Sequence, residues 1–247
     1  MTIEILLAAV AIAFLAAVCQ SLTAFGFALV TVPLLSLAWE VKPAVVTSTV
    51  LGTLILMPLL YEVRGRVPVR RVVPLLIGSL AGIPLGVLIL ERIDSVTLEV
   101  VVAILTIAGS LLIYFSPKMS LRRPLASVSL LVGGLSGALR AATSMGGPPL
   151  ILYTLALERE VERFRATLLA IFLPSSLVTI AALAIAGRVT GDVLLVSVVA
   201  QPAVVLGSLT GHWVRARVSG PAFRLVVLGL LFASSGAVLA TAAGDIA

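Results

Sequence analysis

The sequence predicts an all-α polytopic membrane protein made of two inverted repeats, because of its composition, an internal repeat and the placement of its basic residues. Of its 247 residues, 60% are hydrophobic and only 11% are charged. A crossing of a hydrocarbon core takes roughly 20 mainly apolar residues, and the chain has several such stretches between short charged breaks. This composition excludes a water-soluble domain. The net charge of +6 is spread over short loops, which favours orientation in a lipid bilayer over nucleic-acid binding.

Ten apolar segments follow one another along the chain, bounded by charged residues, proline or glycine. They cover about residues 3–20, 26–38, 43–61, 71–90, 96–115, 125–139, 148–157, 164–186, 192–212 and 222–243. Segments 26–38 and 148–157 are too short to cross alone, 125–139 is marginal, and each short piece follows a glycine-containing break. We therefore expect 8–10 membrane segments, the first of them retained rather than cleaved as a signal peptide.

The two breaks occupy matching positions of an internal repeat. When the chain is shifted by 120 residues along itself, seven identities fall within about 25 positions: Thr23, Gly26, Leu35, Leu37, Glu40, Val41 and Thr47 on Thr143, Gly146, Leu155, Leu157, Glu160, Val161 and Thr167. Gly82 and Gly86 similarly fall on Gly207 and Gly211 at a shift of 125. The sequence thus predicts one repeat over residues 1–118 and a second over 119–247.

The basic residues decide between two topologies. If each broken segment is a single crossing, the basic residues divide eight to eight between the two faces. If each broken segment enters and returns as a helical hairpin, thirteen share one face and three lie on the other, with Arg140 set aside. The three are Lys42, Arg92 and Arg188; the thirteen are Arg64, Arg66, Arg70, Arg71, Lys118, Arg122, Arg123, Arg159, Arg163, Arg165, Arg215, Arg217 and Arg224. The excess of positive charge on cytoplasmic loops favours the hairpins, with both termini outside and the second repeat inverted.

Broken helices at corresponding places in inverted halves indicate a substrate site near the membrane midplane. Gly146 and Gly147 permit a tight turn, and the prolines after them can open a half-helix whose N-terminus attracts anions. Arg140 is a cation away from the main loops, although it could instead anchor the hairpin turn at the membrane surface, and the nearby hydroxyls could bond locally to the backbone. The candidate substrate-binding residues are Gln20, Ser21, Thr23, Gly26, Arg140, Thr143, Ser144, Gly146 and Gly147.

Other features are weaker indications of function. Gln201-Pro202 and Pro174-Ser175-Ser176 are polar kinks that could line a pathway or serve helix packing, and the Gly82xxxGly86 and Gly207xxxGly211 pairs are typical of close helix contact. The eleven acidic residues fall at or near segment ends, which argues against a metal-ion site or a carboxylate proton relay. A nucleophile with an adjacent base is missing, so we expect neither an enzyme nor a cofactor.

Two stretches carry a family resemblance. Residues 145–153 (MGGPPLILY) followed by 164–168 (FRATL), with residues 26–34 (GFALVTVPL) in the first half, resemble the TauE/SafE sulfite exporter family over essentially the whole chain. The resemblance implies transport of sulfite, an organosulfonate or a related organic anion across a bacterial cytoplasmic membrane. Besides the substrate-binding residues, we name Thr47, Arg165, Thr167 and Gln201 as candidate pathway-lining residues.

The function predicted from these observations is secondary transport or facilitated diffusion of a small anion, most simply export driven by the membrane potential. Protons are a candidate coupling ion, and a homo-oligomer is a candidate assembly. The alternative is a non-transporting membrane scaffold or assembly factor that holds a soluble partner through its basic loops. A cation carrier would need membrane-embedded acids, and the sequence places its acids elsewhere.

Overall fold

The computed structural model describes residues 2–23, 25–115, 125–158 and 160–215, and all regular structure in these ranges is helical. The helices are α1 (Ile3–Thr23), α2 (Phe27–Ser36), α3 (Val41–Val63), the 3-10 turn η1 (Arg64–Arg66), α4 (Val69–Arg92), α5 (Ser95–Phe115), α6 (Ala126–Thr143), α7 (Gly147–Leu157), α8 (Val161–Ile185) and α9 (Gly191–Arg215). Six are long and apolar enough to cross a membrane. The predicted membrane-helical class is confirmed, whereas segment 222–243 lies outside the described residues.

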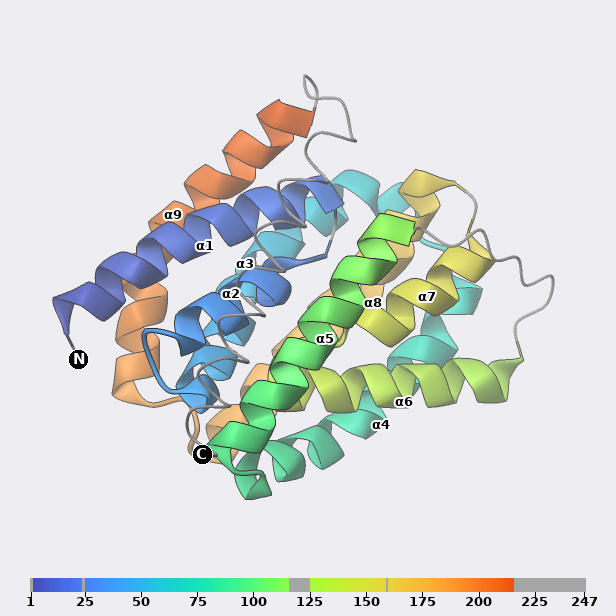
Figure 1. Cartoon of the computed structure of the whole chain (residues 1–247). Helices are drawn as coiled ribbons and strands as arrows, with labels where there is room; N and C mark the ends of the chain where they lie inside the picture. The colour runs from blue at the N-terminus through green and yellow to red at the C-terminus, as the bar shows by residue number, and fades with distance from the viewer. Residues whose placement is uncertain (1, 24, 116–124, 159, 216–247) are drawn as a thin grey trace.

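Each predicted break is a reversal of the chain between a long and a short helix. In Figure 1, α1 comes from the left of the view and α6 from the right, and α2 and α7 each turn back toward the side from which their partner came. Gly26 makes the first turn with a positive φ of 111°, and Ser144 ends α6 with a φ of 63°. Both residues occupy the left-handed region, which a chain uses to change direction sharply. The short helices have 10 and 11 residues, too few to span a bilayer.

Ion pairs show which loops share an end of the molecule. Glu160, before α8, lies 3.6 Å from Arg66 in the α3–α4 connection and 3.1 Å from Arg163 in the first turn of α8. We call the end that carries these loops the arginine-rich end. At the opposite end, Arg188 after α8 pairs with Glu91 in the last turn of α4 at 3.8 Å. These contacts agree with the hairpin topology and contradict the single-crossing alternative, which separates Arg66 from Arg163.

The helices pack in pairs that correspond between the two halves. In the described structure α4 packs on α6 and α1 on α9, while α3 packs on α8 in the middle. Glycines make the outer pairs close: a Cβ on Gly82 would overlap the Gly134 carbonyl, and a Cβ on Gly211 would lie 2.8 Å from the Val18 oxygen. Both glycine pairs named from the sequence therefore serve helix contact. The reciprocal pairing is what a twofold relation would produce; the inversion and the repeat boundary at residues 118–119 stay predictions.

Candidate functional site

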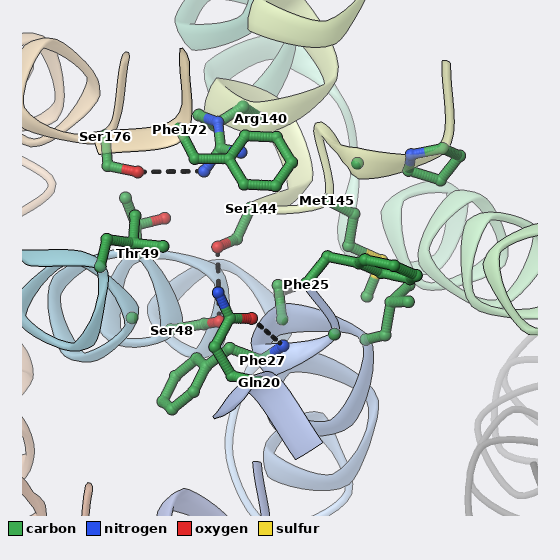
Figure 2. A pocket seen from close by; sticks show the side chains of 17 residues that line it. Gln20, Phe25, Phe27, Ser48, Thr49, Arg140, Ser144, Met145, Phe172 and Ser176 are labelled. Carbon is green, nitrogen blue, oxygen red and sulfur yellow. Dashed lines mark hydrogen bonds between the residues drawn. The ribbon is translucent and has the colours of Figure 1, made fainter. Parts of the chain in front are cut away.

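The tips of the two hairpins meet at a cavity of about 50 Å³, which α3 and α8 also line (Figure 2). Arg140, Phe172 and Ser176 lie on one side of it, and Gln20 and Phe27 on the other. The polar, aromatic and glycine residues that line it are Gln20, Phe25, Gly26 and Phe27 at the first tip, Ser48, Thr49 and Gly52 on α3, Arg140, Ser144 and Gly147 at the second tip, and Phe172 and Ser176 on α8. Two segments separated by more than 110 residues in the chain thus form one site.

Arg140 supplies the charge of this cavity. The side chain is buried, with 7% of the residue exposed, and Nη1 donates a hydrogen bond to Ser176 Oγ at 3.0 Å. The guanidinium carbon lies 4.3 Å from the centroid of the Phe172 ring, at cation–π distance. Among the described residues, no carboxylate pairs with Arg140, and Nε has no hydrogen-bond partner. A buried cation without a counter-charge is costly, so an anion in the cavity would stabilise it.

Hydroxyl groups on α3 and α8 add neutral donors. Ser144 Oγ donates to Ser48 Oγ at 3.3 Å, which leaves the Ser48 proton free to point to a ligand. Ser176 Oγ accepts from Arg140 and keeps its own proton in the same way. Thr49 Oγ1 differs, because it donates to the Val45 carbonyl at 2.9 Å and offers only acceptor capacity. Arg140, Ser48 and Ser176 therefore form a donor set suited to the oxygens of a small anion.

The two half-helix N-termini contribute less than the sequence suggested. The Phe27 N–H, at the start of α2, donates to Gln20 Oε1 at 3.0 Å, so a side chain of α1 already caps this helix. In α7, Pro148 and Pro149 occupy the first turn and have no N–H groups to offer. The positive charge of the site therefore resides mainly in Arg140.

A protein-family comparison matches this chain over residues 9–238 to the family described as Sulfite exporter TauE/SafE. The chain belongs to the TauE/SafE family. This is a family of membrane transporters for sulfite and related anions, so the chain is a multi-pass membrane protein of a transporter family. No curated protein and no solved structure matched the chain.

Five of the substrate-binding candidates line the cavity of this TauE/SafE protein: Gln20, Gly26, Arg140, Ser144 and Gly147. Ser21, Thr143 and Gly146 do not line it. Ser21 Oγ donates to Ser208 Oγ at 3.3 Å in the contact with α9, and Gly146 packs on α6, where its carbonyl accepts from Ser136. Thr143 Oγ1 donates to the Leu139 carbonyl and accepts from the Met145 N–H, the local bonding that the sequence left open. The Thr23 side chain lies outside the described residues.

None of the four pathway candidates lines the cavity. Thr47 is fully buried in α3, and Thr167 Oγ1 donates to the Arg163 carbonyl at 2.8 Å. Gln201 is half-buried on α9. Arg165 is buried near the arginine-rich end, where it pairs with two glutamates. Their part in transport stays a prediction.

The sequence-based prediction did not include Ser48, Thr49 and Phe172, which lie inside long, mainly apolar helices. Ser176 was named only as part of a polar kink. The available signal was helical spacing: Phe172 and Ser176 are four residues apart, so they lie on one face of α8. That face became recognisable only when α8 was found against Arg140.

Proposed function

We propose that this protein is a secondary transporter or facilitator for a small oxyanion, sulfite or a related sulfonate or carboxylate, and that it exports the anion from the cell. The supporting observation is the buried Arg140 guanidinium, which faces a cavity and has no carboxylate partner in the described structure. Buried arginines in membrane proteins are commonly satisfied by paired acids, and here a bound anion would take that place. Membership in the TauE/SafE family supports the same chemistry.

The size of the cavity favours a small substrate. Its volume of about 50 Å³ offers room for roughly four water-sized groups. Sulfite, with one sulfur and three oxygens, matches this space. Ser48 and Ser176 lie at the same cavity and would each donate to one oxygen while Arg140 binds a second or a third.

The membrane potential is a sufficient driving force for export. Moving one negative charge out of a negative interior releases about 2.3 kcal/mol per 100 mV. Proton coupling would have to involve the substrate itself or an acid near a helix end, such as Glu158, which is buried and 2.7 Å from Arg71. We place the protein in a bacterial cytoplasmic membrane with its arginine-rich end inside and both termini outside.

The proposal is tested by sulfite flux into proteoliposomes carrying the wild-type chain, Arg140→Gln or Arg64→Gln. The control residue Arg64 also stacks on an aromatic ring, with 3.7 Å from its guanidinium carbon to the Tyr61 centroid, but it does not line the cavity. Loss of charged hydrogen bonds to the anion should reduce flux at low sulfite about tenfold to a hundredfold in Arg140→Gln, and Arg64→Gln should behave as wild type.

Two results would overturn the proposal. Normal flux in Arg140→Gln would remove this residue from the substrate site. A wild-type protein that moves no anion but binds a soluble partner stoichiometrically would instead support the scaffold or assembly-factor alternative.

A further inference from the structure

A second buried arginine, Arg165, lies on the same face of α8 as the residues that contact Arg140. Arg165, Phe172 and Ser176 are spaced by seven and four residues, which places them in one row along the helix. The seven residues from Phe172 to Arg165 correspond to two helical turns, about 10 Å toward the arginine-rich end. Only 5% of the Arg165 side chain is exposed. A row of residues therefore leads from the central cavity to a second buried cation.

Helix α3 packs on α8 and also lines the Arg140 cavity. Leu56 of α3 lines the cavity, and Glu62 follows six residues later, close to the end of the helix. Glu62 Oε2 lies 3.9 Å from Arg165 Nη2, so α3 and α8 also meet at this level. Helices α3 and α8 thus line the Arg140 cavity and, nearer the arginine-rich end, also carry the ion pair between Glu62 and Arg165.

The ion pairs of Arg165 with Glu62 and Glu162 are long. The distance to Glu62 is 3.9 Å and the distance to Glu162 Oε1 is 3.6 Å, both longer than the 2.7–2.9 Å of a direct charged hydrogen bond. The two glutamate side chains are 34% and 35% exposed, so water reaches the acids and hardly reaches the arginine. An incoming anion could replace these carboxylates beside the guanidinium, because each glutamate can be solvated when it is displaced.

We propose that Arg165 is a second anion-binding position on the route between the Arg140 cavity and the arginine-rich end, and that Glu62 and Glu162 neutralise its charge when no substrate is beside it. The inference rests on the transport function proposed above and adds the route that the anion takes. Arg165 lowers the barrier for the substrate on this side of the cavity, while the two glutamates keep the anion from being held too tightly for release.

The test compares sulfite uptake into right-side-out and inverted membrane vesicles, which offer the anion to opposite ends of the protein, with the membrane potential collapsed. A substitution in a passive carrier cannot change the equilibrium distribution of sulfite across the membrane. Any substitution that lowers kcat/KM must therefore lower it by the same factor in both directions. With Arg165→Gln we expect KM to rise about tenfold at constant kcat when sulfite enters from the arginine-rich end. From the other end we expect kcat to fall about tenfold at constant KM, because release toward Arg165 is slowed.

Arg163→Gln is the matched control, because Arg163 lies two residues earlier on α8 but its side chain is 59% exposed and pairs with Glu160 of the preceding turn. The control should leave both constants unchanged. If Arg165→Gln does not fold, Glu162→Gln decides: removing a competing carboxylate should lower KM from the arginine-rich end.

The inference is overturned if Arg165→Gln leaves both constants unchanged, if it lowers kcat equally from both ends at constant KM, as a structural defect would, or if Glu162→Gln leaves KM unchanged. Failure of the proposed function would look different. In that case wild-type vesicles would take up no sulfite, or Arg140→Gln would leave the uptake unchanged.

Discussion

The contact between α4 and α6 gives a sharp prediction, because two glycines three residues apart on α6 meet very different surroundings. A Cβ on Gly137 would overlap the Ser79 carbonyl oxygen and lie 2.9 Å from the Ser79 Cα. A Cβ on Gly134 would meet only the Gly78 oxygen, at an ordinary 3.6 Å. We therefore expect Gly137→Ala to push α6 away from α4 and Gly134→Ala to fit without movement.

The magnitude follows from this geometry. Carbon atoms pack best at about 3.5–4.0 Å, so Gly137→Ala requires the helices to separate by roughly 1 Å. Overpacking of this kind costs about 1–3 kcal/mol of folding free energy, and alanine recovers up to about 1 kcal/mol through its higher helix propensity. A net loss of about 1–2 kcal/mol corresponds to a melting temperature lower by roughly 2–8 °C in a chain of this size. Gly134→Ala should be neutral or slightly stabilising.

The chain carries its own reporter for this measurement. Cys19 is the single cysteine and is only 6% exposed, so a thiol-reactive fluorescent dye reacts with it when the protein unfolds. Thermal ramps of the two variants and the wild type in the same detergent give the melting temperatures. If Gly137→Ala melts within a degree or so of Gly134→Ala, the helices are not held at backbone contact and the reasoning is wrong.

Three further predictions concern the site, the topology and a helix end. The substitution Phe172→Leu removes the aromatic ring beside Arg140. Because cation–π energies are near 1 kcal/mol, it should raise the KM for sulfite about three- to tenfold. An unchanged KM would show that the ring does not position the Arg140 guanidinium. Single cysteines introduced as Arg66→Cys and Arg163→Cys should react with an impermeant reagent from the same side of the membrane, and labelling from opposite sides would contradict the hairpin topology. The backbone N–H and the hydroxyl of Thr97 donate to the Asp94 carboxylate. These hydrogen bonds lower the pKa of Asp94 below its ordinary range. Because the folded-state pKa is the lower one, the stabilisation by Asp94 is present above the unfolded-state pKa and is lost as the pH falls through the lowered pKa. The difference in melting temperature between wild type and Asp94→Ala, followed by circular dichroism, should therefore vanish on acidification; a difference that persists would mean that the charge does not matter.

Much of the fold could be predicted from the sequence because its signals are local. Runs of apolar residues give the helices, and the glycine and proline residues at 26 and 146–149 give the two breaks. The charge asymmetry separated hairpins from single crossings before any contact was known, since loops on one side share the same bias toward arginine. The Glu160 contacts with Arg66 and Arg163 agree with that choice.

Only part of the candidate site could be predicted, because the sequence reveals local features and the site is built from several helices. Arg140 stood out because a cation inside an apolar region is costly and therefore informative by itself. Gln20 was named as a substrate contact, but the structure also gives it the task of capping α2, which depends on how two helices approach each other. Thr143 bonds within its own helix, although its sequence context is as promising as that of Ser144.

The sequence by itself thus determined that this chain lies in a membrane, where its helices break and which residue carries a buried charge, since each depends on the solvation of a short stretch of chain. Only the tertiary structure decided that Ser48, Phe172 and Ser176 share one cavity with Arg140, and hence that the face of α8 that carries Arg165 is also the face turned to this cavity. Those assignments depend on which sides of the helices pack against each other. That is a property of packing between helices whose contacting residues are more than 30 positions apart, and no local pattern encodes it.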